Sequence, residues 1–364
     1  MRRAVMALAV LALFLVLSPS ARAEDILEKS GAGELYSVLD KDTQALLDSA
    51  GAGEGTIAQP VSGEGMFREL SRMVQEKLSA PLKALGALLA VCVMGRFCGC
   101  FEEGNLAGTA RLTISAACGL VLASPVLGLL ETCQRVTDSA AAFLGAAVPV
   151  YAGLLGASGN AAAGSGYSFV AMLAGEALPV LAGGFFLPLL RVYLALSVAA
   201  SLSGSGLSRL TGALYSFCKW GMVMAVTVFA GILSLQTAVN AQVDAAANKA
   251  AKLALSTGVP IVGSALGDAA AAIQNSLNMV RSGAGAFGIL AALCIFAPAV
   301  VECLLWAGVC MAAQTAAEVL EVPQAGAMAG AFGGAARMVL AVLASVCVVC
   351  LVTAGAIVFV RTGG

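Results

Sequence analysis

Histidine is absent from this 364-residue chain, and only 11% of its residues are charged. Without histidine, the chain lacks the usual general base and the commonest metal ligand of proteins. It also lacks a Gly-x-x-x-x-Gly-Lys-Ser/Thr phosphate-binding loop, so it does not hydrolyse nucleotides by that route. We therefore expect no catalytic residues, no cofactor and no bound metal, and any energy must come from a partner or a gradient.

Two short motifs approach those of intramembrane proteases but lack essential parts. Gly156-Ala-Ser-Gly159 matches the serine motif of rhomboid-type proteases, yet the chain has no histidine to activate that serine. Ala265-Leu-Gly-Asp268 approaches the Gly-x-Gly-Asp motif of intramembrane aspartyl proteases, but no second aspartate lies in an apolar span. An intramembrane hydrolase therefore ranks behind the other functional classes.

Cysteine is missing from residues 24–79, although the chain has eleven cysteines in total. All of them lie in or beside apolar stretches, where cysteine behaves as a small hydrophobic residue. Cys98-Gly-Cys100 and Cys347-Val-Val-Cys350 have neither a histidine nor a second pair at zinc-finger spacing to complete a metal site. We expect the cysteines to be structural.

The composition is that of an integral membrane protein, with 60% hydrophobic residues and a mean hydropathy of +0.93. Stretches long enough to cross about 30 Å of hydrocarbon occur at residues 84–101, 112–130, 140–157, 169–201, 217–236, 286–313 and 338–360. We therefore predict an all-α polytopic fold with about seven transmembrane helices. The fourth stretch contains Pro179, Pro188 and Gly183-Gly184, so it forms either a tilted broken helix or a tight hairpin.

The first 23 residues have the three parts of a cleavable signal peptide. Arg2 and Arg3 supply the charge, residues 4–17 are apolar, and Ala21-Arg22-Ala23 fits the small-residue cleavage rule. Cleavage would start the mature chain at about Glu24, outside the cytoplasm. An uncleaved first helix is the alternative.

Residues 24–79 are expected to form an acidic extracytoplasmic segment. Eleven acidic and five basic side chains give it a net charge of −6, which excludes nucleic-acid binding. The glycine-rich linker Gly51–Pro60 separates two short helices. The second begins near Gly65, carries an apolar stripe at helical spacing and continues toward the first span, with Pro81 at the predicted membrane surface.

The membrane region divides into three predicted parts. Residues 80–237 form a first bundle of about five spans, and residues 286–364 form the last two spans and a short tail. Between them, residues 238–285 are too polar to span and too apolar for a solvated loop, which indicates a re-entrant or interfacial helical hairpin. Seven spans place six basic residues inside and four outside, whereas splitting the fourth span gives five and six. Because positive loops favour the cytoplasm, we prefer seven spans with the C-terminus inside.

Charged residues inside apolar spans are candidate functional positions, because they tend to face protein or water. Glu302 lies deep in the sixth span, and Glu176 and Arg191 lie in the fourth. Glu302 is either a coupling residue or a structural ion pair or hydrogen-bonded acid. Small residues spaced four apart allow close helix packing, within the subunit or between subunits; they are Gly263, Gly267, Gly326, Gly330 and Gly334.

The order of these parts resembles the stage III sporulation protein AE family. The resemblance is carried by Lys249–Asp268, by Leu187-Pro-Leu-Leu-Arg-Val-Tyr-Leu-Ala-Leu-Ser197, by Lys219-Trp220 with Phe229–Ser234, and by Gly288–Pro298. It implies a multi-pass protein of the mother-cell membrane around the forespore, with an extracytoplasmic N-terminus. The implied activity is that of a non-enzymatic subunit of a channel or secretion-like apparatus that supports late forespore gene expression.

The resemblance also implies partners. They are the other membrane proteins of the same operon: the small membrane proteins AC and AD, the ring-forming proteins AG and AH, and the ATPase AA. The lipid bilayer surrounds the protein, and a homo-oligomer is compatible with the glycine pattern. The alternative function is a stand-alone secondary transporter, in which the fourth span and the 238–285 hairpin would form a substrate site.

Overall fold

The computed structural model describes residues 32–53, 63–100, 106–157, 161–203, 207–258 and 263–359. Every regular element in these ranges is helical, which confirms the all-α prediction. The predicted signal peptide lies outside the described residues. The elements are α3 (Ala32–Ser37), α4 (Lys41–Ser49), α5 (Gly63–Cys100), α6 (Leu106–Ala157), α7 (Ala161–Pro179), the π-helix η3 (Val180–Phe186), α8 (Leu187–Ser203), α9 (Leu207–Gly258), α10 (Gly263–Val319) and α11 (Pro323–Phe359).

Six stretches of the described helices are long and apolar enough to cross a membrane, which indicates a multi-pass membrane protein. They are Glu64–Phe97, Leu112–Gly156, Ala162–Leu202, Arg209–Gln236, Ala284–Val319 and Pro323–Gly355. The sequence predicted seven. The difference arises because residues 112–130 and 140–157 belong to the single helix α6. The polar residues between them, from Glu131 to Ser139, keep helical geometry and do not make a turn.

The predicted fourth span is one continuous helical rod and not a hairpin. α7 leads into η3, a seven-residue π-helical stretch that contains Gly183-Gly184, and η3 leads into α8. Gly183 packs against the side-chain amide of Gln134 on α6, where a Cβ atom would clash. The absence of a side chain at Gly183 therefore lets η3 pass close to α6.

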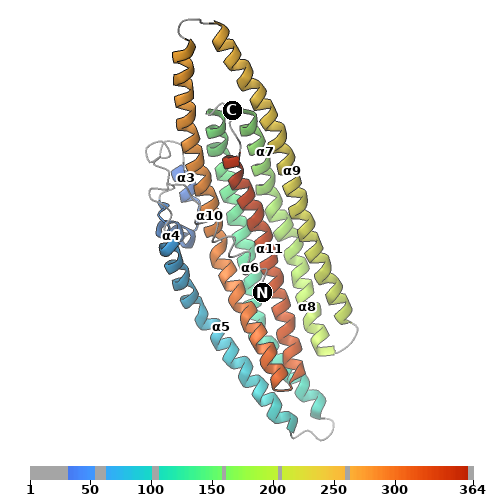
Figure 1. Cartoon of the computed structure of the whole chain (residues 1–364). Helices are drawn as coiled ribbons and strands as arrows, with labels where there is room; N and C mark the ends of the chain where they lie inside the picture. Colours follow the sequence, from blue (N-terminus) through green and yellow to red (C-terminus); the bar gives the residue numbers. More distant parts are fainter. Residues whose placement is uncertain are drawn as a thin grey trace.

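The predicted helical hairpin at residues 238–285 is continuous with the long helices on either side of it. Its described part continues α9 to Gly258 and begins α10 at Gly263. In Figure 1, the ends of these two helices project together beyond the rest of the bundle. The ends of α9 and α10 therefore lengthen two of the spans beyond the rest of the bundle. Because the chain forms six long helical rods, the N-terminal end of α5 and the C-terminal end of α11 lie at the same end of the bundle, whereas seven spans would place them at opposite ends.

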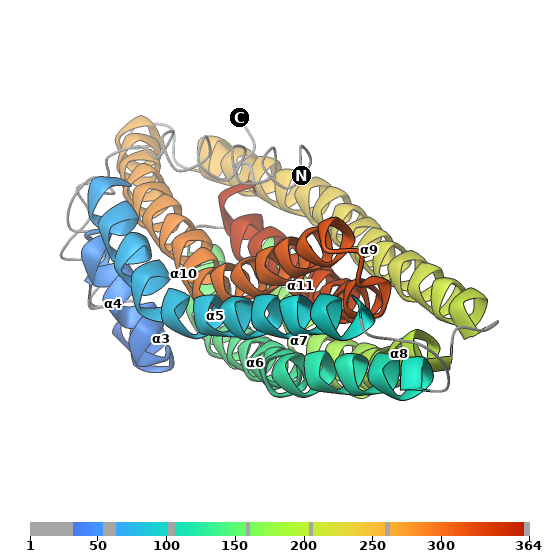
Figure 2. The same cartoon turned by 90° about the horizontal axis from the view of Figure 1, so that it is seen from below.

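The antiparallel pair α10 and α11 forms the centre of the bundle (Figures 1 and 2). α5 packs along α10, α9 packs along α11, and α6, α7 and α8 complete the body. The core consists of small and apolar side chains, with Tyr151, Phe143, Phe287 and Phe296 among its largest fully buried members.

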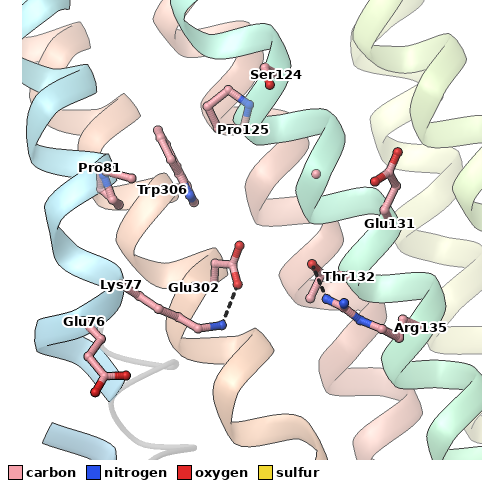
Figure 3. A pocket seen from close by; sticks show the side chains of 12 residues that line it. Glu76, Lys77, Pro81, Ser124, Pro125, Glu131, Thr132, Arg135, Glu302 and Trp306 are labelled. Carbon is pink, nitrogen blue, oxygen red and sulfur yellow. Dashed lines mark hydrogen bonds and ion pairs between the residues drawn. The ribbon is translucent and has the colours of Figure 1, made fainter. Parts of the chain in front are cut away.

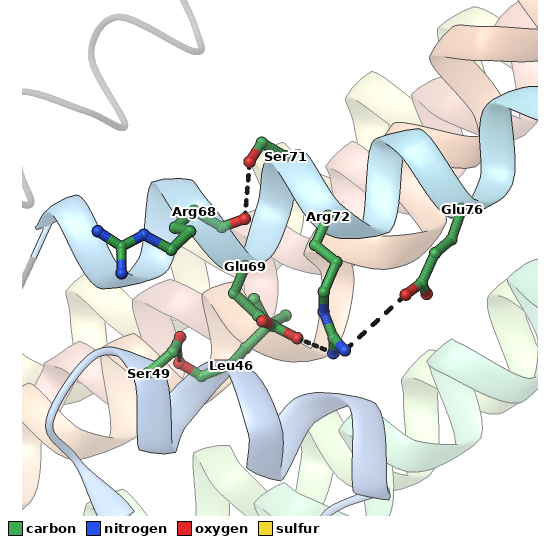
Figure 4. Close-up of polar contacts among 7 residues, drawn as sticks. All are labelled: Leu46, Ser49, Arg68, Glu69, Ser71, Arg72 and Glu76. Atoms are coloured by element: carbon green, nitrogen blue, oxygen red, sulfur yellow. Dashed lines mark hydrogen bonds and ion pairs between the residues drawn. The ribbon is translucent and has the colours of Figure 1, made fainter.

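The two short helices α3 and α4 pack beside the body, against α6, α5 and α10. Asp40 caps α4 by accepting a hydrogen bond from the Lys41 backbone amide at 2.9 Å. Leu46 and Leu47 are fully buried on the inner face of α4. Figure 4 shows α4 below the first turns of α5, where Arg72 lies between Glu69 and Glu76 and forms ion pairs with both. The predicted amphipathic helix and first span are thus the single helix α5, and Pro81 lies inside it.

Close packing around glycine is tightest at Gly288 on α10. Tyr151 of α6 donates a hydrogen bond to the Ala284 carbonyl oxygen at 2.9 Å, and its ring is fully buried. A Cβ atom at position 288 would collide with the Tyr151 hydroxyl group. The absence of a side chain at this position therefore lets α6 and α10 approach each other.

We expect Gly288→Ala to destabilise the folded protein by about 1–3 kcal/mol, because the methyl group overpacks the core and displaces a hydrogen-bonded tyrosine. Thermal unfolding of the purified protein in detergent measures the effect. Gly145→Ala on α6 is the matched control, because nothing lies within 4 Å of its Cβ position. Equal melting temperatures for the two variants would contradict this account of the α6–α10 contact.

Candidate functional site

Glu302 of α10 forms an ion pair with Lys77 of α5. The Lys77 Nζ donates to Glu302 Oε2 at 2.8 Å (Figure 3), and the two side chains are 35% and 26% exposed. The partners lie 225 positions apart in the chain. The structure therefore places this span carboxylate against a cation from the first long helix.

A second ion pair joins the far end of α5 to the turn between α10 and α11. Arg96 Nη1 lies 2.8 Å from Glu321 Oε2. Glu321 has a positive φ of 57°, a conformation that favours glycine, and the Val322 amide closes the turn by donating to Ala317 O at 2.9 Å. The ion pair with Arg96 explains why position 321 is a glutamate, although its backbone conformation favours glycine.

The two ion pairs have matching spacing along parallel helices. Lys77 and Arg96 lie nineteen positions apart on α5, as do Glu302 and Glu321 on α10 and its turn. Nineteen helical residues rise about 28 Å, close to the hydrocarbon thickness of about 30 Å. Between the pairs, α5 carries only one other charged residue, Lys83, and α10 carries only Glu318.

An open cleft of about 630 Å³ lies beside the Lys77–Glu302 pair, between α5, α6 and α10. Figure 3 shows Pro81, Pro125 and Trp306 on one side of the ion pair and Glu76 and Arg135 on the other. The remaining lining residues are Lys77, Ala80, Ser124, Gly128, Glu131, Thr132 and Glu302. The cleft therefore has an apolar wall of Pro81, Pro125 and Trp306 toward Arg96, while Glu131 lies at the same level on α6 and the other charged residues lie at or beyond the ion pair.

The charges of the cleft are only partly neutralised. Arg135 Nη2 donates to Thr132 Oγ1 at 3.2 Å and forms no ion pair within the described part of the chain. Glu131 also has no ion-pair partner there. The α6 ridge that carries these two residues also borders a second open cleft of about 510 Å³, whose lining includes Asp138 and Arg191. We call the level of Lys77, Glu131, Arg135, Arg191 and Glu302 the polar layer.

The predicted charged residues of the fourth span are not brought together. Glu176 lies exposed on α7, Arg191 lies exposed on α8, and η3 separates the two helices. Neither forms an ion pair with another described residue. Arg191 does line the second cleft, together with Asp138, Glu131 and Arg135, so it belongs to the polar layer.

The predicted packing glycines lie along two helices. On α11, Gly326 faces Ala317 and Gly330 faces Gln314, both of α10. Gly334 packs against the Tyr193 hydroxyl group of α8, where a Cβ atom would clash. These three positions therefore pack within the subunit; Gly263 and Gly267 occupy the first turns of α10.

The cleft is equipped to hold charged groups rather than to activate a nucleophile. Ser124 and Thr132 supply its hydroxyl groups, and neither has an imidazole base, because the chain lacks histidine. Over the described ranges, no group of three or more Cys, Asp or Glu side chains could hold a metal ion.

The sequence identified Glu302 and Arg191 as candidate residues but did not predict which charged residues lie beside them. Lys77 was assigned to the extracytoplasmic segment, and its distance from Glu302 in the chain hides the pair. The signal that could have found both ion pairs is the equal nineteen-residue spacing of two bases and two acids around apolar stretches.

We expect the Lys77–Glu302 pair to contribute more to stability than the Arg96–Glu321 pair. A double-mutant cycle with Lys77→Gln and Glu302→Gln should give a coupling of about 1–2 kcal/mol, because the pair is largely shielded from water. The same cycle with Arg96→Gln and Glu321→Gln should give about 0.5 kcal/mol or less, because its side chains are 52% and 70% exposed. Unfolding in detergent measures both, and equal couplings would contradict the prediction.

Comparison with known proteins gives one match. The family model described as stage III sporulation protein AE matches residues 44–361. No curated protein matches the chain. No solved structure matches it either.

Proposed function

The chain belongs to the stage III sporulation protein AE family, and we propose that it is a non-enzymatic membrane subunit of a channel or secretion-like apparatus between mother cell and forespore. In this role it supports late forespore gene expression. Its proposed partners are the small membrane proteins AC and AD, the ring-forming proteins AG and AH, and the ATPase AA. The family match over nearly the whole chain is the observation that carries the proposal.

The spacing of the two ion pairs supports a position for the chain in the bilayer. In this proposal the hydrocarbon surrounds the part of the bundle between the Lys77–Glu302 pair and the Arg96–Glu321 pair. We call this part of the bundle the membrane half. The exposed large apolar side chains of α6 and α10 support it: Leu112, Leu120, Leu127, Leu304, Met311 and Val319 all fall at that level. Residues 140–157 of α6, α7 and residues 284–297 of α10 then form a distal half outside the hydrocarbon.

The charged helix α4 supports the same position. It carries Asp40 as its cap and Lys41, Asp42 and Asp48, and it packs against α5 and α10 beside the distal half (Figure 1). Burying these charges in lipid would be costly. The larger apolar residues of α6 in the distal half, such as Phe143 and Tyr151, are buried against protein.

The proposed orientation places the distal half outside the cytoplasm of the mother cell. The opposite end of the bundle has three short connections and carries Arg96, Arg111 and Arg209. Positive charge at short loops favours the cytoplasmic side, but the α9–α10 end also carries three basic residues, Lys249, Lys252 and Arg281. The proposed orientation therefore rests on the predicted signal peptide. With six spans, the described N-terminal helices and the C-terminal end of α11 share the extracytoplasmic side, and the proposed signal peptide exports α3 and α4.

The distal half is then the part of the chain that extends toward the forespore. Phe169 and Met172 of α7 are exposed there. We propose that partner subunits cover this surface, because large apolar side chains outside lipid are unfavourable in water.

Affinity purification of the tagged full-length chain from sporulating cells tests the proposed function. We expect the operon partners to co-purify from detergent extracts of the mother-cell membrane. A Phe169→Asp/Met172→Asp variant should lose at least one partner while keeping its membrane insertion, whereas Leu120→Asp, in the membrane half, should reduce insertion itself. Recovery of a lone species with solute-uptake activity would contradict the proposal and favour a secondary transporter.

A further inference from the structure

We propose that the cleft between α5, α6 and α10 binds the headgroup of a zwitterionic glycerophospholipid that carries a primary ammonium group. Neither the family nor the proposed channel role assigns a ligand to this cleft. The proposal goes beyond that role and does not depend on the partner subunits.

The position of the cleft suits a lipid headgroup. It lies at the Lys77–Glu302 level, where the apolar stretch of α5 begins, and it is open toward the surroundings of the bundle. Its apolar wall is formed by Pro81, Pro125 and Trp306 (Figure 3). Tryptophan is enriched at the boundary between hydrocarbon and headgroups. Proximal acyl carbons would lie against the apolar wall, and the headgroup would reach the charged residues.

The charges of the cleft define the headgroup. Lys77 and Glu302 neutralise each other at 2.8 Å. Glu76 is paired with Arg72. The remaining charged lining residues are the guanidinium of Arg135 and the carboxylate of Glu131. Arg135 presents planar N–H donors that match phosphate oxygens, and a carboxylate accepts hydrogen bonds from an ammonium group.

This combination discriminates between common lipid headgroups. An anionic headgroup would satisfy Arg135 but would be repelled by the carboxylate of Glu131. A trimethylammonium headgroup has no N–H donors for that carboxylate. A phosphate joined to a primary ammonium satisfies both kinds of charge, and a cleft of about 630 Å³ is large enough for it.

The two tryptophans of the chain allow a direct measurement. Trp306 lines the cleft, and Trp220 lies exposed on α9. In a Trp220→Phe background, Trp306 is the only tryptophan. The full-length protein is reconstituted into vesicles of phosphatidylcholine that contain small fractions of brominated lipid, which quenches nearby tryptophan. We expect brominated phosphatidylethanolamine to quench Trp306 with an apparent affinity about fivefold higher than brominated phosphatidylglycerol or phosphatidylcholine.

Variants in the same background test the named contacts. Arg135→Gln should lower the apparent affinity for all three lipids about fivefold, because each carries a phosphate, and Glu131→Gln should make the affinity for phosphatidylethanolamine equal to that for phosphatidylcholine. Both residues are exposed, so the fold should remain intact. Arg209→Gln and Glu318→Gln, at the opposite end of the bundle, are the matched controls and should keep the preference.

Three outcomes would overturn the proposal. Equal quenching by all three brominated lipids would show that Trp306 contacts only the ordinary lipid around the protein and that the cleft selects no headgroup. An unchanged affinity in Arg135→Gln together with an unchanged preference in Glu131→Gln would exclude the assigned contacts. Reversal of the quenching by inorganic phosphate alone would assign the cleft to free phosphate and not to a lipid. None of these outcomes bears on the association with sporulation partners, which the purification experiment tests separately.

Discussion

The matched spacing of two ion pairs along two parallel helices is the constraint on which the arrangement of this protein depends. Lys77–Glu302 and Arg96–Glu321 hold α5 to α10 at two levels that lie about 28 Å apart along the helices. A shift of α5 by one turn relative to α10 would break both pairs together. Both pairs therefore favour the same register of the first long helix on the central helix, and their separation matches one hydrocarbon layer.

This constraint explains why the helices are longer than a membrane requires. α6 has 52 residues and rises about 78 Å, more than twice the hydrocarbon thickness. Only the membrane half needs an apolar outer surface, and α6 and α10 expose their large apolar side chains there. In the distal half α6 and α10 bury their large apolar residues, such as Phe143, Tyr151 and Phe287, and contacts such as Gly288 against Tyr151 bring the two helices close.

The sequence predicted the helical class, the membrane location and the family, because composition and the order of apolar stretches carry that information. It did not predict how the stretches join. The polar segment from Glu131 to Ser139 looked like a loop between two spans, but in the fold it is the part of α6 that borders both clefts. The pairing of Lys77 with Glu302 was also beyond sequence reasoning, since it depends on which distant helices pack together. Glycine spacing predicted close packing, yet only the structure shows that Gly334 faces Tyr193 of α8.

The position of the hydrocarbon can be measured most directly with two single cysteines on the outer surface of α6. Gly145 is exposed about 21 Å beyond the level of Glu131 by helical rise, and Leu120 is 79% exposed in the membrane half. Both are changed to cysteine and treated with a membrane-impermeant maleimide in right-side-out vesicles; the parent chain, whose described cysteines are almost all buried, gives the background. Thiols react as thiolates, which require water. The account predicts labelling at Gly145→Cys and protection at Leu120→Cys. Protection at Gly145→Cys with labelling at Leu120→Cys would contradict it.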